Sequence, residues 1–279
     1  MPRDSKVVVI TGAGSGIGAA LAAEAARDGA LLVLAGRRIE ALNEVAAALP
    51  GTRRPLIVQA DVTTADGRQS LREACLRAGG RVDLLINNAG VVRTGPIGSM
   101  SDKAVMDMLH TNLAAPLLLS RDLLPFLKRS ANPRIVNVGS MFGDIAFPLF
   151  AAYSASKFGL RGLSDALRRE LAPEGVGVTY AAPRAVNTPA AREFEELVAP
   201  FAMKLDDPRK VARRIWRGAA KGKRTVYPAG PERLFILVQQ LFPGVVEGNI
   251  VKQLTQYVAT LPAPHETTIA SAGGDSKIV

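Results

Sequence analysis

The stretch VVVITGAGSGIG, residues 7–18, decides the fold that this sequence predicts. Residues 7–10 form a short apolar run that predicts a buried strand, and the alanine-rich segment after the glycines predicts a helix. Gly12 permits a tight turn, Gly16 lets the backbone approach a pyrophosphate, and Gly18 lets the helix pack closely on the strand. This order predicts a nucleotide-binding site, although the spacing Gly-x-x-x-Gly-x-Gly differs from the general Gly-x-Gly-x-x-Gly pattern.

Strand and helix patterns alternate along the rest of the chain. Buried-strand patterns follow at residues 31–35, 56–59, 82–86, 134–138 and 177–181. Helical patterns occupy about residues 66–78, 102–128, 158–171, 190–204 and 208–221. The alternation predicts an α/β fold with a doubly wound parallel sheet.

Length and composition favour a single domain. The chain has 279 residues, and no linker-like segment divides its apolar runs. We expect a folded unit over residues 1–261, with a cofactor half to about residue 135, a catalytic and substrate half from about residue 136, and a flexible tail over residues 262–279. The single cysteine, Cys75, excludes an internal disulfide, and two histidines offer no metal cluster.

Charge and the first residues bear on location and partners. The apolar run after the charged first residues is broken at once by Thr11 and Gly12, so it is interpreted as a strand and not as a signal peptide. No stretch reaches the length of a membrane-spanning helix, which makes the cytoplasm the default location. The net charge of +10 suits an anionic partner, but scattered arginines favour a solvated surface over a nucleic-acid interface.

The end of the second strand decides which nicotinamide cofactor fits. An acidic residue there would bind the ribose hydroxyls of NAD, whereas an arginine would accept a 2′-phosphate. This chain has Gly36, Arg37 and Arg38 at that point. We predict NADP(H), with Ser15 and Arg37 as phosphate contacts and Arg38 stacked on the adenine. The alternative is that both arginines are simply solvated at the start of a helix.

Polar residues also follow the third and fourth strands. Asp61, with Val62 after it, could accept a hydrogen bond from the adenine amino group, or could instead form an Asx-turn or helix cap. Residues 87–90, Asn-Asn-Ala-Gly, are small or carry amides that could line an adenosine channel and fix neighbouring strands.

One asparagine lies inside the long helix expected at residues 102–128. Pro116 should kink this helix or open its hydrogen-bond ladder. Asn112 is therefore either an ordinary exposed residue or the mark of a local opening with a water-holding carbonyl.

Three residues between positions 140 and 157 carry candidate acid/base chemistry. Ser140 follows a buried strand, and Tyr153 and Lys157 lie four residues apart on one face of a helix. An ammonium beside a phenol favours the phenolate, so we expect Lys157 to lower the pKa of Tyr153. The Ser140 hydroxyl would hold a carbonyl or alcohol oxygen against that phenol.

The segment at residues 231–246 is apolar on nearly all sides. It is too short to cross a bilayer, so four interpretations remain: a core helix, a subunit contact, a lid over an apolar pocket, or an interfacial anchor. The pattern favours the first two.

The ordered set of motifs resembles the short-chain dehydrogenase/reductase family over about residues 6–188. The motifs are Thr11-Gly12-x-x-x-Gly16-Ile17-Gly18, Asn87-Asn88-Ala89-Gly90, Asn112, Ser140 and Tyr153-x-x-x-Lys157. The resemblance implies a Rossmann-type fold, a homo-oligomer formed through the helices near residues 102–128 and 153–171, and hydride transfer between NADP(H) and a carbonyl or alcohol.

The resemblance also implies roles for individual residues. Tyr153 would be the general acid/base, Ser140 would orient the substrate oxygen, and Lys157 would hold the nicotinamide ribose, with the main chain near Asn112 holding a water. The catalytic set is then Asn112, Ser140, Tyr153 and Lys157. The cofactor contacts would be Gly12, Ser15, Gly16, Ile17, Gly18, Arg37, Arg38, Asp61, Val62, Asn88, Ala89, Gly90, Tyr153, Lys157, Pro183, Val186 and Thr188.

One position departs from the family pattern. The family usually has Pro-Gly before the nicotinamide-facing segment, and this chain has Pro183-Arg184. Arginine does not take a positive φ cheaply, so the backbone there is either ordinary or strained. Arg184 could favour an anionic group at the substrate entrance, or could be a surface residue.

The substrate follows from looser similarity. The apolar helix near residues 234–242, the basic residues 221–224 and the segment after Thr188 are similar to subsets of the family that act on lipid-like or other apolar carbonyls. We expect a small-molecule carbonyl or alcohol substrate of that kind, a possible peripheral contact with a membrane surface, and no nucleic acid. The alternative function is a non-catalytic NADP(H)-binding sensor of the same fold.

Overall fold

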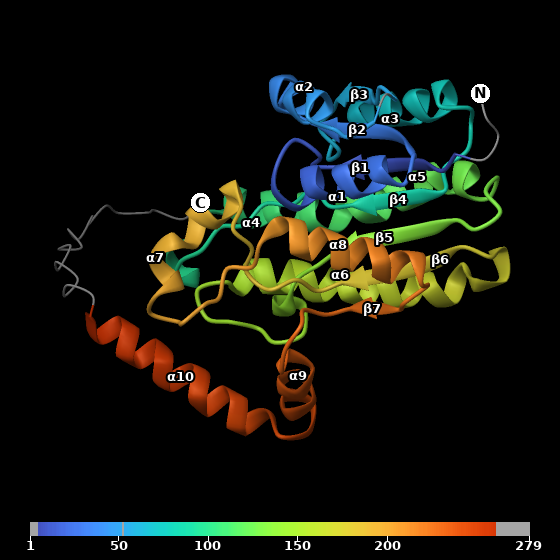
Figure 1. The fold of residues 1–279 in the computed structure, drawn as a ribbon. Coiled ribbons are helices and arrows are strands. Elements are labelled where there is room, and N and C mark those ends of the chain that lie inside the picture. The colour runs from blue at the N-terminus through green and yellow to red at the C-terminus, as the bar shows by residue number, and fades with distance from the viewer. Residues whose placement is uncertain (1–4, 52, 261–279) are drawn as a thin grey trace, which may run out of the picture.

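A computed structural model describes residues 5–51 and 53–260 of the chain. Its centre is a seven-stranded parallel sheet with the order β3-β2-β1-β4-β5-β6-β7 (Figure 1). The strands are β1 (Val7–Thr11), β2 (Leu31–Gly36), β3 (Leu56–Gln59), β4 (Leu84–Asn87), β5 (Arg134–Val138), β6 (Gly177–Ala181) and β7 (Thr225–Val226). The predicted doubly wound fold is therefore confirmed, and β7 is an addition that the sequence patterns did not predict.

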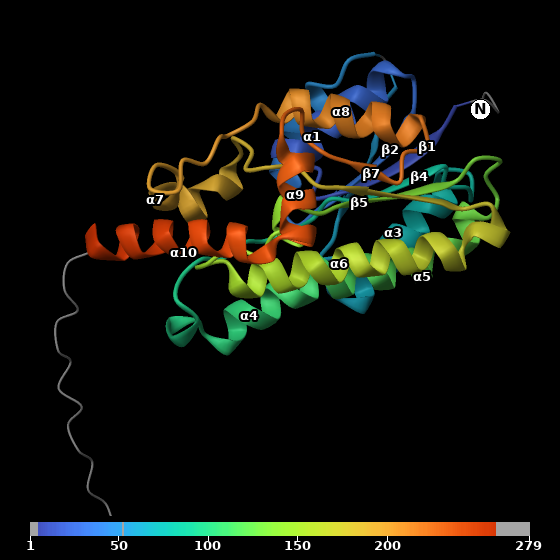
Figure 2. The same ribbon diagram turned by 90° about the horizontal axis from the view of Figure 1, so that it is seen from below.

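Helices cover both faces of the sheet because its strands are apolar on both sides. Figure 2 shows the two layers. On one face lie α1 (Gly16–Arg27), α2 (Ile39–Ala47) and α8 (Pro208–Ala220). On the other lie α3 (Ala65–Arg77), α4 (Asp102–Leu109), α5 (Ala115–Leu127) and α6 (Ala151–Glu170). Cys75 is buried in the second layer, and burial raises its pKa to about 12.

The strand order reverses between β1 and β4. These two strands pair in parallel, with Val8 opposite Leu84 and Ile10 opposite Ile86. The chain leaves β1 toward the α1 layer and leaves β4 toward the opposite layer. The two loops separate at this point, which opens a crevice at the carboxyl ends of the strands.

The helix expected at residues 102–128 is interrupted. A π-helical turn at His110–Ala114 separates α4 from α5, and Pro116 is the second residue of α5. The hydrogen-bond ladder opens beside the proline, as predicted, because a proline cannot donate the bond that would close an ordinary turn. Asn112 lies within this turn and is fully buried, so its interpretation as an exposed residue is wrong.

The prediction of one helix at residues 190–204 is wrong. The structure instead has a 3-10 segment at Pro189–Phe194 and a single turn, α7 (Glu195–Val198). Pro200 lies inside the expected helix. A proline has no backbone amide to donate and disfavours helical geometry at the residue before it, so a helix that began after Pro189 could not continue past residue 199. The helix expected at residues 208–221 is confirmed as α8, and Asp207 caps it by accepting from the Arg209 amide at 2.8 Å.

The apolar segment at residues 231–246 forms two helices. One is α9 (Glu232–Leu241), and Pro243 begins α10 (Pro243–Thr260), bent from it by 113°. The core interpretation of the segment is wrong, because Leu234 is 59% exposed and Phe242 is 62% exposed, and only Glu232 and Ile236 of α9 are buried. The tail expected beyond residue 261 lies outside the described residues.

Within the described residues, no single helix is long and apolar enough to cross a bilayer. The pair α9 and α10 together reaches the length and hydropathy of a span, but the 113° bend lies between them. Both helices extend from the body of the molecule (Figures 1 and 2).

Substitution of two helical glycines should have opposite effects on stability. A Cβ at Gly18 would lie 2.2 Å from the Gly12 carbonyl oxygen, so Gly18→Ala should lower the free energy of unfolding by about 2 kcal/mol or more. A Cβ at Gly162 in α6 would meet nothing within 4 Å, so Gly162→Ala should raise stability by about 0.5–1 kcal/mol. Urea unfolding of both variants measures the difference, and equal effects would contradict the close packing of α1 on the first turn.

Candidate functional site

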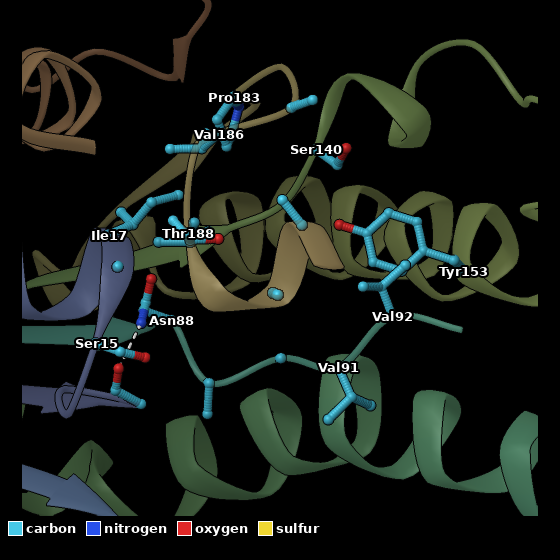
Figure 3. Close-up of a pocket in the computed structure, with 18 of the residues that line it drawn as sticks. Ser15, Ile17, Asn88, Val91, Val92, Ser140, Tyr153, Pro183, Val186 and Thr188 are labelled. Carbon is cyan, nitrogen blue, oxygen red and sulfur yellow. Dashed lines mark hydrogen bonds between the residues drawn. The ribbon is translucent and has the colours of Figure 1, made fainter. Parts of the chain in front are cut away.

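A cleft of about 600 Å³ opens at the carboxyl ends of the strands. Its walls come from the loops after β1, β2, β4, β5 and β6, and from the first turns of α1 and α6. Figure 3 shows Ser15, Ile17 and Thr188 on one side of this space and Tyr153 and Val92 on the other. The cleft thus joins the glycine turn to the residues that carry acid/base chemistry.

The glycine turn leaves room for an anionic group at the start of α1. Gly16 has a φ of +55°, and a Cβ on it would lie 2.8 Å from a Thr188 methyl, so only glycine fits beside that residue. Ser15 precedes the helix, and its side chain makes no capping hydrogen bond to the first turn. Ser15, Gly16 and Ile17 line the cleft, so the first turn of α1, where backbone amides lack helical partners, borders it, as binding of a phosphate requires.

Amides and a hydroxyl tie the strand ends together below the cleft. The Asn88 side-chain amide donates to the carbonyls of Thr11 at 3.0 Å and Gly12 at 3.2 Å, and the Thr11 hydroxyl accepts from the amides of Asn88 and Ala89. Asn87 donates to the Asn137 side chain at 2.8 Å. The expectation that these amides fix neighbouring strands is confirmed.

The end of β2 brings two arginines to the cleft. Arg37 and Arg38 both line it, beside Gly36. Asp61, after β3, is not among the lining residues and instead forms an Asx-turn, its carboxylate accepting from the Thr63 amide at 2.9 Å and hydroxyl at 2.7 Å. Burial acts to raise the pKa of Asp61, but these hydrogen bonds and the charge of Arg37 outweigh it and leave the pKa below its ordinary value.

Most predicted cofactor residues come together around this space. The lining includes Gly12, Ser15, Gly16, Ile17, Arg37, Arg38, Asn88, Ala89, Gly90, Tyr153, Lys157, Pro183, Val186 and Thr188. Gly18 packs beneath the turn, where it contacts Gly12 and Asn88. Val62 is buried in the core below β3 and, like Asp61, does not line the cleft.

Ser140, Tyr153 and Lys157 converge at one end of the cleft. Tyr153 and Lys157 lie on the first two turns of α6, and the Lys157 amine is 5.6 Å from the centre of the Tyr153 ring. That amine is buried and donates to the Val138 carbonyl at 3.1 Å. Figure 3 shows the Tyr153 phenol oxygen directed toward the part of the cleft where Ser140 lies.

Ser140 is held by its own turn and by a tyrosine on β6. Its hydroxyl accepts from the Phe142 amide at 3.1 Å. The Tyr180 phenol donates to the Ser140 carbonyl at 3.0 Å and accepts from the Ser140 amide at 3.3 Å. The backbone position of Ser140 is therefore set from both sides.

The pKa values of the pair differ from the sequence expectation. Burial raises the pKa of Tyr153 to about 12, with the neighbouring Ser140 hydroxyl acting in the opposite direction, and burial lowers the pKa of Lys157 to about 8. The expected lowering of the Tyr153 pKa is therefore not found in the protein alone, because burial acts against the charged form of the phenol and outweighs the Ser140 hydrogen bond.

Asn112 supports the site through its side chain. Its amide exchanges two hydrogen bonds of 2.9 Å with the Val91 backbone and donates to the Ser156 hydroxyl at 3.0 Å. A Cβ at Gly90 would lie 3.2 Å from the Asn112 carbonyl oxygen and 3.7 Å from the Lys157 amine. The π-helical turn therefore brings Asn112 next to Lys157 and holds the loop after β4 against α6.

Arg184 occupies the position where the family pattern has glycine. The described residues with a positive φ other than glycine are Leu149 and Ala202, so the backbone at Arg184 is ordinary. Its guanidinium donates to both oxygens of Asp206, at 2.8 and 3.1 Å, and pairs with Glu232 at the start of α9. The Asp206 hydrogen bond raises the pKa of Arg184 further. Two carboxylates engage the arginine, so it links the cleft to α9 rather than facing an anionic ligand.

Aromatic residues form the wall beside Tyr153. Phe142, Phe147 and Phe150 pack on one another near the Tyr153 ring. Phe201 meets Phe147 edge to face, with 5.1 Å between ring centres, and the ring centre of Tyr257 from α10 lies 5.4 Å from that of Phe201. The sequence patterns did not predict this wall. The phenylalanine spacing in residues 142–150 was its one visible signal, and nothing local pointed to Tyr257.

The described residues hold no group of three or more side chains suited to bind a metal ion. The cleft itself presents a hydroxyl, a phenol and an amine beside an apolar wall, with the glycine turn at its other end.

Comparison with known proteins identifies the same arrangement elsewhere. The family model described as short chain dehydrogenase matches residues 6–198. A dehydrogenase/reductase SDR family member 7B from Bos taurus is 32% identical over 254 residues, covering 86% of this chain and 78% of that protein. A 3-oxoacyl-[acyl-carrier-protein] reductase FabG from Thermotoga maritima is 30% identical over 206 residues, covering 73% of this chain and 83% of the relative.

A solved structure shows the same fold. A short chain dehydrogenase/reductase from Burkholderia phymatum, crystallised in complex with NAD, superposes with a TM-score of 0.77 at 27% identity. The superposition covers 86% of this chain and 94% of that one. Its bound nucleotide supports a nicotinamide cofactor for the fold.

The buried amine of Lys157 should make stability depend on pH. Its pKa is lowered to about 8 in the folded protein, so the unfolded chain binds the proton more tightly. The free energy of unfolding therefore rises as pH rises from about 8 toward the unfolded pKa near 10.4, by about 2 kcal/mol between about pH 7.5 and 9.5. Urea unfolding at both pH values should show this rise in the wild type relative to Lys157→Met.

The matched control for this experiment is Lys103→Met. The Lys103 side chain on α4 is 83% exposed, so removal of its amine should leave the pH dependence of the wild type intact. Parallel stability curves for the wild type and Lys157→Met would contradict the pKa of the buried amine.

Proposed function

The chain belongs to the short-chain dehydrogenase family, and we propose that it interconverts a carbonyl and an alcohol with NADP(H), using Tyr153 as general acid/base. The observation that carries this proposal is the convergence of Ser140, Tyr153 and Lys157 at one end of a glycine-lined cleft. A nicotinamide nucleotide supplies or accepts the hydride when it is bound there. The protein's own part is to bind, orient and move a proton.

The three side chains divide this work. In the direction of reduction, the Ser140 hydroxyl donates to the substrate oxygen, and the Tyr153 phenol gives its proton to that oxygen as negative charge develops on it. Lys157 is mostly an ammonium at pH 7, since its pKa is about 8. Its positive charge, 5.6 Å from the phenol ring, stabilises the phenolate that remains.

The cradle at the other end of the cleft suits a dinucleotide. We propose that the amides following Gly12 and Gly16, with the Ser15 hydroxyl, hold the pyrophosphate, and that Val186 and Thr188 hold the carboxamide end. Asn112 acts as a positioning residue, because its amide is engaged by Val91 and Ser156.

The cofactor preference follows from the end of β2. Arg37 and Arg38 line the cleft where an acidic residue would otherwise bind a ribose 2′-hydroxyl. A guanidinium matches the geometry and charge of a 2′-phosphate. We therefore propose NADP(H) over NAD(H) for this chain, in contrast to the Burkholderia phymatum relative, whose structure holds NAD.

The substrate proposed is an apolar carbonyl or alcohol. The wall next to the Tyr153 ring consists of Phe142, Phe150 and their aromatic neighbours, which offer dispersion contacts and few polar partners. Arg184 lines the cleft but is neutralised by Asp206 and Glu232, so it does not favour an anionic substrate group.

Loss of the Tyr153 phenol oxygen should abolish turnover but not cofactor binding. Oxidation of NADPH is measured against aldehydes and ketones graded in chain length and ring number. We expect kcat/KM to rise with apolar size in the wild type and to fall at least about a hundredfold in Tyr153→Phe, because the proton donor is gone.

Cofactor fluorescence provides the control for that variant. NADPH should bind Tyr153→Phe and the wild type with similar affinity, because the phenol is distant from the phosphate cradle. Tight NADPH binding by the wild type with no turnover of any carbonyl would favour a non-catalytic sensor over the reductase.

A charge reversal at Arg37 should change the cofactor preference. In Arg37→Glu, the ratio of kcat/KM for NADPH to that for NADH should fall roughly tenfold to a hundredfold, since a charged hydrogen bond to the 2′-phosphate is lost. Arg54→Glu makes the same charge change at an exposed position that does not line the cleft, and it should keep the wild-type ratio. An unchanged ratio in Arg37→Glu would exclude Arg37 as the phosphate contact.

A further inference from the structure

Apolar side chains are exposed together on α9 and α10. Fourteen large apolar side chains are exposed in the described residues, and eight of them lie within positions 234–258. The largest exposed fractions among the eight belong to Leu234, Leu241, Phe242 and Val245, at 59%, 61%, 62% and 59%. Scattered exposed apolar residues are ordinary, but a contiguous group of this kind marks a surface that meets something apolar.

Other residues of this helix pair pack against the body of the molecule. Glu232 and Ile236 of α9 are buried, and Glu232 pairs with Arg184 beside the cleft. Leu254 and Tyr257 of α10 pack on the aromatic wall around Phe201. The pair is therefore attached to the body by these contacts, and its exposed apolar side chains, called here the outer face, are Leu234, Phe235, Leu237, Leu241, Phe242, Val245, Val251 and Val258. Figure 1 shows that α9 and α10 extend from the body of the molecule.

The segment of the chain that leads into α9 is rich in basic residues. Positions 204–233 contain ten basic residues and three acidic ones. Of the acidic residues, Asp206 and Glu232 pair with Arg184. Around Tyr227, just before α9, Arg233 lies over the ring at 6.0 Å and Arg214 donates to the carbonyl oxygen. An apolar outer face thus adjoins a positively charged region.

This combination favours an anionic lipid surface over a second copy of the chain. A two-fold contact through the outer face would bring the basic regions of two molecules, each with a net charge of +10, next to one another. A bilayer with anionic headgroups instead offers an apolar interior to the outer face and negative charge to the basic residues.

We propose that the outer face of α9 and α10 is a docking surface for an anionic lipid bilayer. The 113° bend and the short length of α9 suit helices that lie in the interface rather than cross it. Leu234, Phe235, Leu241 and Phe242 insert among the acyl chains, while Arg214 and Arg233 remain at the headgroups.

Docking of this kind would place the bilayer beside the cleft. Tyr257 and Leu254 connect α10 to the aromatic wall, so an apolar substrate could pass from the lipid to Tyr153 without crossing water. This consequence rests on the proposed function, whereas the docking surface itself does not.

The test is vesicle binding by the full chain without substrate. Sedimentation is measured with vesicles of phosphatidylcholine alone and with vesicles containing about one third phosphatidylglycerol. We expect binding to the anionic vesicles that weakens as salt is raised, and that falls about tenfold or more in Leu234→Ser/Phe242→Ser.

A matched control is available elsewhere on the surface. Leu76 is 59% exposed and Ile97 is 67% exposed, which nearly equals the exposure of Leu234 and Phe242. Leu76→Ser/Ile97→Ser should bind vesicles as the wild type does. Equal loss in the two double variants, or no binding by the wild type, would overturn the proposal.

Sedimentation without vesicles tests the alternative that the outer face binds a second copy of the chain. If the wild type is an oligomer that Leu234→Ser/Phe242→Ser dissociates, then the outer face is a contact between copies and the lipid proposal is overturned. Vesicle binding is measured apart from catalysis, so a failure here leaves the Tyr153 experiment unaffected, and the reverse also holds.

Discussion

The parallel pairing of β1 with β4 is the constraint on which the rest of the site depends. From these adjacent strands the chain departs to opposite faces of the sheet, so a crevice must open between the two loops. Thr11 and Asn88 lock the loops where they diverge. Because every strand is parallel, the loops after β2, β5 and β6 reach the same edge, and they bring Arg37, Ser140 and Thr188 to one cleft.

Burial governs the chemistry at the other end of that cleft. Burial raises the pKa of Tyr153 to about 12 and lowers that of Lys157 to about 8, so in the protein alone the charged form of each group is less favoured than in water. Lys157 retains a pKa of about 8 and a hydrogen bond to the Val138 carbonyl, so its amine is held close to the phenol in a state that titrates near neutral pH. Positive charge next to Tyr153 has a larger effect at such a site than in open water, because burial of the Lys157 amine reduces solvent screening.

The C-terminal helices are joined to the site by two different kinds of contact. Arg184 connects the loop after β6 to Glu232 by charge, and Tyr257 connects α10 to Phe201 by aromatic packing. In the first contact, Arg184 stands where the family pattern has glycine, and its side chain holds the start of α9. The second extends the aromatic wall with a residue from a helix that is otherwise mostly exposed.

The sequence by itself determined the order and type of most elements, because apolar periodicity records which side of a strand or helix is buried. The glycine turn and the spacing of Tyr153 and Lys157 are likewise local, so the cradle and the shared helix face could be predicted. Tertiary structure alone decided that Asn112 is buried in a π-helical turn, that the Asp61 carboxylate is engaged in an Asx-turn, and that residues 190–204 do not form one helix. It also decided the direction of the Tyr153 pKa and the contacts of Arg184 and Tyr257. These depend on desolvation and on contacts between residues about 50 positions apart, which no local pattern encodes.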